Sequence, residues 1–201
     1  MKDVILCTVA DLFLKYGVRS ISMDDIAHHQ GISKKTIYEN FKDKNDLVVQ
    51  VTLKFIEKWV KEYEEIKINS IDAIDELFLL TKLIRKHFAK LNPSLMFDVR
   101  KYHPQAWDMF LKYEEDIAYP SVVDNLKRGI EEGFFRPDIN VQILAKIRLE
   151  QIHHTIDEDL FPKDQFDLME VRLQIFDHFV HGLLSKSGLF LFNNYQKRND
   201  E

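Results

Sequence analysis

The sequence predicts an all-α protein, and three observations lead to that fold class. Apolar residues recur at spacings of three and four over most of the 201 residues, as they do on one face of an amphipathic helix. Only 6 glycines and 5 prolines interrupt these patterns. No segment alternates apolar and polar residues over a useful length, and neither repeats nor low-complexity segments occur.

The first helix is predicted over about residues 5–16 and ends at Gly17, because glycine accepts the left-handed conformation that terminates many helices. Its apolar face consists of Ile5, Leu6, Val9, Leu12, Phe13 and Tyr16. Ser22 is expected to cap a second helix, with Asp25 three residues later as a variant of the capping box. Gly31 then interrupts the chain, and Ser33 caps a third short helix.

Asp43 is expected to cap a long fourth helix, along which Leu47, Val51, Phe55 and Trp59 repeat every four residues. A fifth helix is predicted from Asn69 or Ser70 to about residue 91. Later helices begin near Pro104 and Pro120, where proline suits a first turn, and the second of these ends at Gly133. The last long helices are predicted over 141–157 and about 167–185, and the tail is expected to fray at its polar end.

Composition indicates a soluble cytoplasmic protein. The single cysteine excludes a disulfide within the chain, and no apolar run has the length of a signal peptide or a membrane span. The net charge is −5, but residues 1–48 carry seven basic and seven acidic side chains, so the excess of acid lies in the remainder. Residues 33–44 have a local charge of +2. This distribution favours a head that meets phosphate and a body that does not.

Two short helices joined by a glycine turn after a longer helix predict a helix-turn-helix, whose second helix enters the major groove of DNA. Its first turn reads base edges, while hydroxyls, lysines and free N–H groups contact phosphate. We therefore predict a double-stranded DNA operator as partner. The predicted DNA-binding residues are Ser22, Ser33, Lys34, Lys35, Thr36, Tyr38 and Lys44.

Residues 5–47 resemble the DNA-binding head of the TetR family of bacterial transcriptional regulators. The resemblance is carried by Ile5-Leu6, Leu12-Phe13, Gly17, Ser22, Ile26-Ala27, Gly31-Ile32-Ser33, Thr36-Ile37-Tyr38, Phe41, Lys44 and Leu47, with no gap in their spacing. Thr8-Val9, Gln30 and Lys35 depart from the family pattern, and Lys35 bears on which bases are read.

The resemblance implies an Ω-shaped homodimer and a repressor that a small molecule releases from a palindromic operator. It divides the chain into a helix-turn-helix domain, residues 1–48, and a helical regulatory and dimerisation domain, residues 49–201. The alternative is a DNA-binding protein of the same fold that responds to a protein partner, or a chromosome-associated factor, with no small effector.

Apolar residues on two sides of helix 167–185 indicate that it has two packing partners, its own core and a second subunit. The predicted dimer-interface residues are Ile143, Ile147, Val171, Ile175, Phe179 and Leu183. The alternative is that this helix is central to the core of a single chain.

Residues 97–120 are rich in aromatic side chains, as are pockets for apolar or aromatic ligands. The predicted effector-binding residues are Phe88, Phe97, Trp107, Phe110 and His153. The alternative is that these aromatic residues form ordinary core.

The sequence does not favour an enzyme, a cofactor or a metal. Glu150 and His153 have the spacing of one half of a di-iron site, but such a site needs a second unit. His178 and His181 share a helix face, although pairs of this kind are more often surface or interface residues. No phosphate-binding glycine loop, metalloprotease motif or nucleophile elbow is present.

Overall fold

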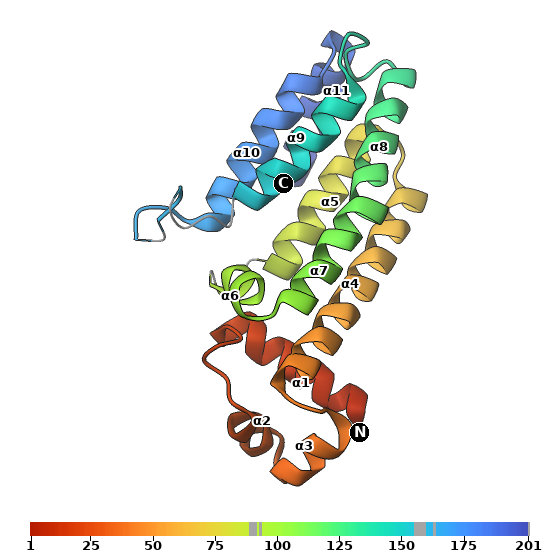
Figure 1. The fold of residues 1–201 in the computed structure, drawn as a ribbon. Helices are drawn as coiled ribbons and strands as arrows, with labels where there is room; N and C mark the ends of the chain where they lie inside the picture. The colour runs from red at the N-terminus through yellow and green to blue at the C-terminus, as the bar shows by residue number, and fades with distance from the viewer. Residues whose placement is uncertain (89–91, 93, 155–159, 163, 201) are drawn as a thin grey trace. The chain divides into compact units, whose positions relative to one another are not determined.

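The computed structural model describes residues 1–88, 92, 94–154, 160–162 and 164–200, and it confirms the predicted all-α fold. Figure 1 shows the helices in chain order. Their bounds are α1 Lys2–Tyr16, α2 Met23–Gln30, α3 Lys34–Asn40, α4 Lys44–Asn69, α5 Ala73–Phe88, α6 Leu95–Tyr102, α7 Pro104–Tyr113, the π-helical turn η1 Glu114–Ala118, α8 Tyr119–Glu131, α9 Val141–His154, α10 Leu168–Leu183 and α11 Lys186–Asp200. In the described residues the only β-pairing is an isolated bridge between Phe135 and Leu184.

The predicted capping residues begin and end the first helices. Gly17 follows α1 with φ 81°, and Gly31 follows α2 in the left-handed conformation with φ 64°. Asp43 Oδ1 accepts a hydrogen bond of 2.9 Å from the amide of Asp46 in the first turn of α4. Local sequence therefore determines where these helices start and stop, because each cap satisfies backbone groups that the helix leaves unpaired.

Two boundaries differ from the sequence-based prediction. α4 continues to Asn69, and α5 begins only after Asp72, whose Oδ1 accepts hydrogen bonds from the amides of Ile74 and Asp75 at 2.9 and 2.8 Å. The C-terminal tail forms α11, a helix that was not predicted. Its Tyr195 hydroxyl donates a 2.9 Å hydrogen bond to Asp72 Oδ2, so tertiary contacts stabilise this helix.

The chain forms two compact units, each with its own apolar core. Unit 1 comprises residues 1–61 and 90–113, and unit 2 comprises residues 62–89 and 114–201. α4 contributes to both units. None of the described helices combines the length and the apolar character that crossing a membrane requires.

The core of unit 1 joins the three short N-terminal helices to the start of α4. Its fully buried side chains are Ile5, Val9, Val18, Ile26, Ile37, Phe41, Leu47 and Val48. Val99 of α6 and Ala106 of α7 belong to the same cluster. A helix of seven or eight residues is marginal in isolation, so this shared core stabilises α2 and α3.

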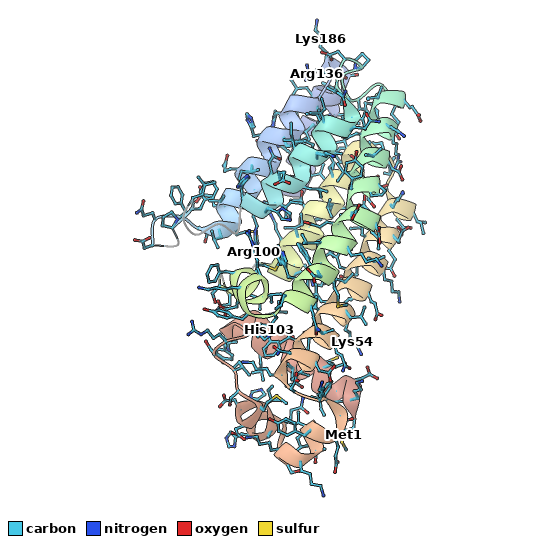
Figure 2. The ribbon with its side chains drawn as sticks, in the orientation of Figure 1. Met1, Lys54, Arg100, His103, Arg136 and Lys186 are labelled. Atoms are coloured by element: carbon cyan, nitrogen blue, oxygen red, sulfur yellow. The ribbon has the colours of Figure 1, made fainter. Side chains whose placement is uncertain are left out.

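The core of unit 2 is formed by side chains of α5, α8, α9, α10 and α11. α8 contacts α5 and α9, α11 packs on α5, and α10 on α9 (Figure 1). The segment that links α8 to α9 is held against the end of α10. There the guanidinium of Arg136, labelled in Figure 2, donates to the carbonyl oxygen of Gly182 at 2.8 and 3.1 Å.

Candidate nucleic-acid interface and effector site

Ser22 and Ser33 are N-caps of the two short helices. Ser22 Oγ accepts from the amide of Asp25 at 3.1 Å, and the Asp25 carboxylate accepts from the amide of Ser22 at 2.8 Å, which completes the predicted capping box. Ser33 Oγ accepts from the amide of Thr36 at 3.0 Å and lies 2.8 Å from the Thr36 hydroxyl. Both serines are therefore committed to their helices, and each would reach phosphate only with its remaining hydrogen-bonding capacity.

α3 carries four of the five remaining predicted contact residues. Lys35 and Tyr38 are exposed, while Thr36 is half-buried. Lys34 forms an ion pair of 2.9 Å with Asp24 of α2, which the sequence analysis did not foresee. This pair links α2 to α3, so Lys34 would have to exchange Asp24 for phosphate or a base in order to contact DNA.

Lys44 lies at the start of α4 and is half-buried. Burial lowers the pKa of its ammonium group, while the nearby carboxylates Asp98 and Asp25 raise it. Next to it, His103 Nδ1 lies 2.7 Å from Asn45 Oδ1 (His103 is labelled in Figure 2). Burial, followed by the charge of Lys44, also lowers the pKa of His103. Within unit 1, the turn between α6 and α7 therefore contacts the helix start that carries Lys44.

Gln30 supplies a contact that a sequence pattern does not reveal. Its side-chain amide donates to the carbonyl oxygens of Val4 and Ile5 at 3.3 and 3.4 Å, which connects the end of α2 to α1. The position was singled out only because it departs from the family pattern. The contact gives this departure a structural role.

The capping box leads to a pH-dependent prediction. Hydrogen bonds from the hydroxyl and amide of Ser22 lower the pKa of Asp25 below its usual value. A carboxylate with a lowered folded-state pKa contributes stability above its unfolded pKa of about 4, and loses that contribution as the pH falls. The Tm of Asp25→Asn should therefore lie below that of the wild type at pH 7, and the difference between the two Tm values should narrow as the pH falls below about 4. Asp11→Asn, which changes an exposed carboxylate that caps no helix, is the control. A Tm difference between wild type and Asp25→Asn that stays constant down to pH 3 would contradict a stabilising role for the ionised Asp25 carboxylate.

A surface hollow of about 560 Å³ opens in unit 1 between the start of α4 and the start of α7. Its lining residues are Lys42, Asp43, Asn45, Asp46, Val49, His103, Pro104, Gln105 and Ala106. None of the predicted effector-binding residues lines it. Its polar groups are largely engaged, since Asp46 accepts from the amide of Lys42 at 2.8 Å and from Gln50 at 2.7 Å.

The predicted effector residues are divided between the two units. The rings of Trp107 and Phe110 lie in unit 1 with their centroids 5.3 Å apart and their planes tilted by 32°. Phe97 is 46% exposed, and its ring lies beneath the ammonium of Lys101. His153 lies in unit 2, where its Nε2 is 2.7 Å from Glu114 Oε2 in the π-helical turn. The side chain of Phe88 lies outside the described residues. Phe97 therefore lies at the surface of unit 1, and its role in effector binding stays a prediction.

The predicted dimer-interface residues differ in how far they are buried within one chain. Phe179 and Leu183 belong to the core of unit 2, and Val171 is also buried within the chain. Their burial within one chain leaves little of these three side chains for a second subunit to cover, and their assignment to an interface stays a prediction. Ile175 is half-buried, whereas Ile143 and Ile147 of α9 are 56% and 42% exposed. The helical spacing of apolar residues predicts that they are buried. It does not predict whether the same chain or a partner chain covers them.

His153 and His181, each from a pair with metal-ligand spacing, contact other groups of the protein. His153 contacts Glu114 and, more weakly, Glu150 at 3.8 Å, and His181 lies 2.9 Å from the carbonyl oxygen of Asp177 in its own helix. Over the part of the chain that the structure describes, no three His, Cys, Asp or Glu side chains are grouped so that they could hold a metal ion.

Comparison with known proteins identifies the family. Residues 5–51 match the model of bacterial regulatory proteins of the tetR family. The transcriptional repressor KstR2 of Mycobacterium tuberculosis is 26% identical over 141 residues, which cover 68% of this chain and 70% of the repressor. Residues 5–51 span the helix-turn-helix described above. The relative is named as a helix-turn-helix transcriptional repressor.

Two crystal structures share the fold. The ketosteroid transcriptional regulator KstR2 superposes with a TM-score of 0.62 and 20% identity over 92% of this chain and 95% of the other. A transcriptional regulator of Saccharomonospora viridis in complex with choline superposes with a TM-score of 0.76 and 20% identity over 92% and 98%. The fold and the N-terminal motif thus define a DNA-binding transcriptional regulator rather than an enzyme. Residues 5–51 thus match the TetR family of bacterial regulatory proteins, and 68% of the chain aligns with a transcriptional repressor.

Proposed function

We propose that the protein is a repressor that binds a palindromic operator as a homodimer and is released by a small-molecule effector. The observation that supports it best is the capped α2–α3 pair, which leaves Lys35 and Tyr38 exposed at the start of a recognition helix. The relatives support control by a ligand, since one is a ketosteroid regulator and another binds choline. These two ligands do not indicate one chemical class for this chain.

The proposed DNA contacts come from the first turns of the helices and from their lysines. Lys35 and Thr36 are proposed to read base edges in the major groove, with Lys34 exchanging Asp24 for the DNA. Ser22, Ser33, Tyr38 and Lys44 are proposed to contact phosphate. Residues 1–48 would then act as the DNA-binding domain and residues 49–201 as the regulatory domain, in the bacterial cytoplasm where the chromosome lies.

Release by an effector follows from a population shift. A ligand that binds one conformation of the dimer more tightly than another raises the population of that conformation. If the preferred conformation places the two recognition helices at a separation other than one DNA turn, about 34–36 Å, operator affinity falls. The ligand needs no contact with DNA.

An electrophoretic experiment tests this function. The protein should retard the DNA fragment upstream of its own gene, and members of a metabolite library should reverse that retardation in proportion to their affinity for the free protein. A protein that binds the fragment but responds to no small molecule, and whose DNA binding changes with a protein partner, would support the alternative of control by a protein. Failure to bind any double-stranded DNA would refute both.

The homodimer leads to a separate prediction. Ile143 and Ile147 are one turn apart on the exposed side of α9, so they form a short apolar stripe that a second copy would cover. Ile147→Glu should convert the dimer to a monomer in sedimentation at micromolar concentration, because a charge would be buried without a partner. Ile68→Glu, at a residue that is 78% exposed near the end of α4, should leave the dimer intact.

A wild-type protein that sediments as a monomer would contradict the dimer itself. Dissociation by Ile147→Glu and Ile68→Glu alike would contradict the placement of the interface on α9.

A further inference from the structure

Arg148 of α9 is a buried cation that has no counter-ion among the residues that the structure describes. It is 8% exposed, and it is the one cationic side chain among the buried polar residues that the structure describes. The other buried polar side chains form hydrogen bonds; Glu114, for example, lies 2.7 Å from His153, and Asn125 donates to the carbonyl oxygen of Ala73 at 3.1 Å. Within the described residues the guanidinium of Arg148 has neither a hydrogen bond nor an ion pair.

Two phenylalanine rings of α10 provide the surroundings of this charge. Arg148 Cζ lies 4.9 Å from the ring centroid of Phe176 and 5.7 Å from that of Phe179. Ring faces attract a cation, but they accept none of the five N–H groups that a guanidinium donates. The rings therefore offset only part of the desolvation cost, and the hydrogen-bonding capacity of the side chain remains unused.

The charge persists at neutral pH. Burial lowers the pKa of Arg148 to about 10, which still leaves the group protonated at pH 7. Burial also lowers the pKa of Arg172, one turn before Phe176 on α10. An anion that entered this part of unit 2 would be attracted by the poorly hydrated cation of Arg148.

A second buried polar group lies one turn from Arg148. Gln151 is three residues further along α9, so both side chains leave the helix on the same side. Gln151 Oε1 is buried and has no hydrogen-bond partner within the described part of the chain. An unsatisfied buried acceptor is uncommon in native proteins and calls for a donor. A buried acceptor that lacks a donor among the described residues, one turn from a buried cation, indicates a ligand rather than a defect of packing.

We propose that Arg148 binds the carboxylate of an organic acid with an apolar body, with Gln151 Oε1 accepting a hydrogen bond from the same molecule. The rings of Phe176 and Phe179 would contact its apolar part. The proposal rests on the proposed function, because it specifies the chemical class of the effector. A planar guanidinium holds a carboxylate through two parallel hydrogen bonds, which accounts for an arginine at this buried position.

Direct binding to the DNA-free protein tests the proposal. Calorimetry would compare decanoate with decanol, and naphthoate with naphthalenemethanol, so that each pair differs in the anionic group. The acid of at least one pair should bind the wild type more tightly than its alcohol. Arg148→Met should weaken that acid about 10- to 100-fold, the loss expected for a charge-assisted hydrogen bond, and leave the alcohol unchanged. Arg85→Met, which removes an exposed arginine of the same unit, is the matched control.

Further variants keep the test decisive. Should Arg148→Met fail to fold, Arg148→Lys keeps the charge without the planar fork and should bind the acid with intermediate affinity. Acids that bind no better than their alcohols, or that bind Arg148→Met as well as the wild type, would overturn the proposal. So would dissociation of the dimer by Arg148→Met, since the missing anion would then come from a second copy.

The two proposals can fail separately. Acids that bind through Arg148 without releasing DNA would refute the proposed effector response and leave the site in place. Release of DNA by neutral or cationic molecules alone would refute the acid site and leave the repressor function in place.

Discussion

Gly188→Ala is expected to lower the free energy of unfolding by about 3 kcal/mol, because overpacking against groups that cannot move costs that much. A Cβ at Gly188 would overlap the carbonyl oxygen of Phe134 and lie 2.9 Å from its carbonyl carbon. This carbonyl accepts the amide of Ser185 at 2.9 Å, so it cannot withdraw without losing a hydrogen bond. The close approach joins the start of α11 to the segment after α8.

Chemical denaturation of the full chain measures this effect, and Gly182→Ala is its control. Gly182 lies within α10, and nothing lies within 4 Å of the position that its Cβ would take. Replacing a helical glycine by alanine should stabilise the protein by about 0.5–1 kcal/mol. Equal effects of the two substitutions would show that α11 does not pack against the segment after α8 as described.

Variants of Lys35, Thr36 and Lys44 should separate base reading from phosphate binding. Lys35→Ala or Thr36→Ala should change which operator bases are preferred, reducing discrimination at one position by about 1–3 kcal/mol. Lys44→Ala should instead weaken binding to all sequences and lower the salt-dependence slope by about 1, because a phosphate contact is lost. Fluorescence anisotropy with the operator, single-base variants and unrelated DNA at several salt concentrations measures both effects.

Lys58→Ala provides the control, since it removes an exposed lysine from α4 outside the predicted DNA-binding residues. It should change neither base preference nor the salt slope. Uniform weakening by all three of the variants at positions 35, 36 and 44 would mean that Lys35 and Thr36 contact phosphate rather than bases. Thr36 needs the comparison most, because its hydroxyl lies 2.8 Å from that of Ser33 at the cap of α3.

The N-terminal head is the part that could be predicted closely from sequence. Gly17, Ser22, Gly31 and Ser33 act through backbone groups only a few residues away, so their positions predict helix ends without knowledge of the fold. The inward positions Ile26, Ile37 and Phe41 follow from helical spacing in the same way. The resemblance of residues 5–47 rests on these same positions.

The body was less predictable, for two physical reasons. Helical periodicity predicts that Phe179 and Leu183 are buried, but it does not say which surface covers them, and the covering surface is the chain's own core. Arg148 was overlooked although it continues an apolar series with Leu144, Ala145 and Ile152. A charged residue inside an apolar series indicates a buried charge, and the sequence contains this signal at Arg148. Its significance depends on what lies opposite it on α10, which is a property of the packed structure.

The sequence by itself determined the all-α fold class, the ends of the first helices and the family, because these depend on local spacing and local capping. Tertiary structure alone decided that α11 is a helix, that Lys34 pairs with Asp24, and that Arg148 lies against two phenylalanine rings. Each of these features depends on contacts between elements that are separated along the chain. The free energy of such contacts depends on how those elements pack, which the sequence of one segment does not determine.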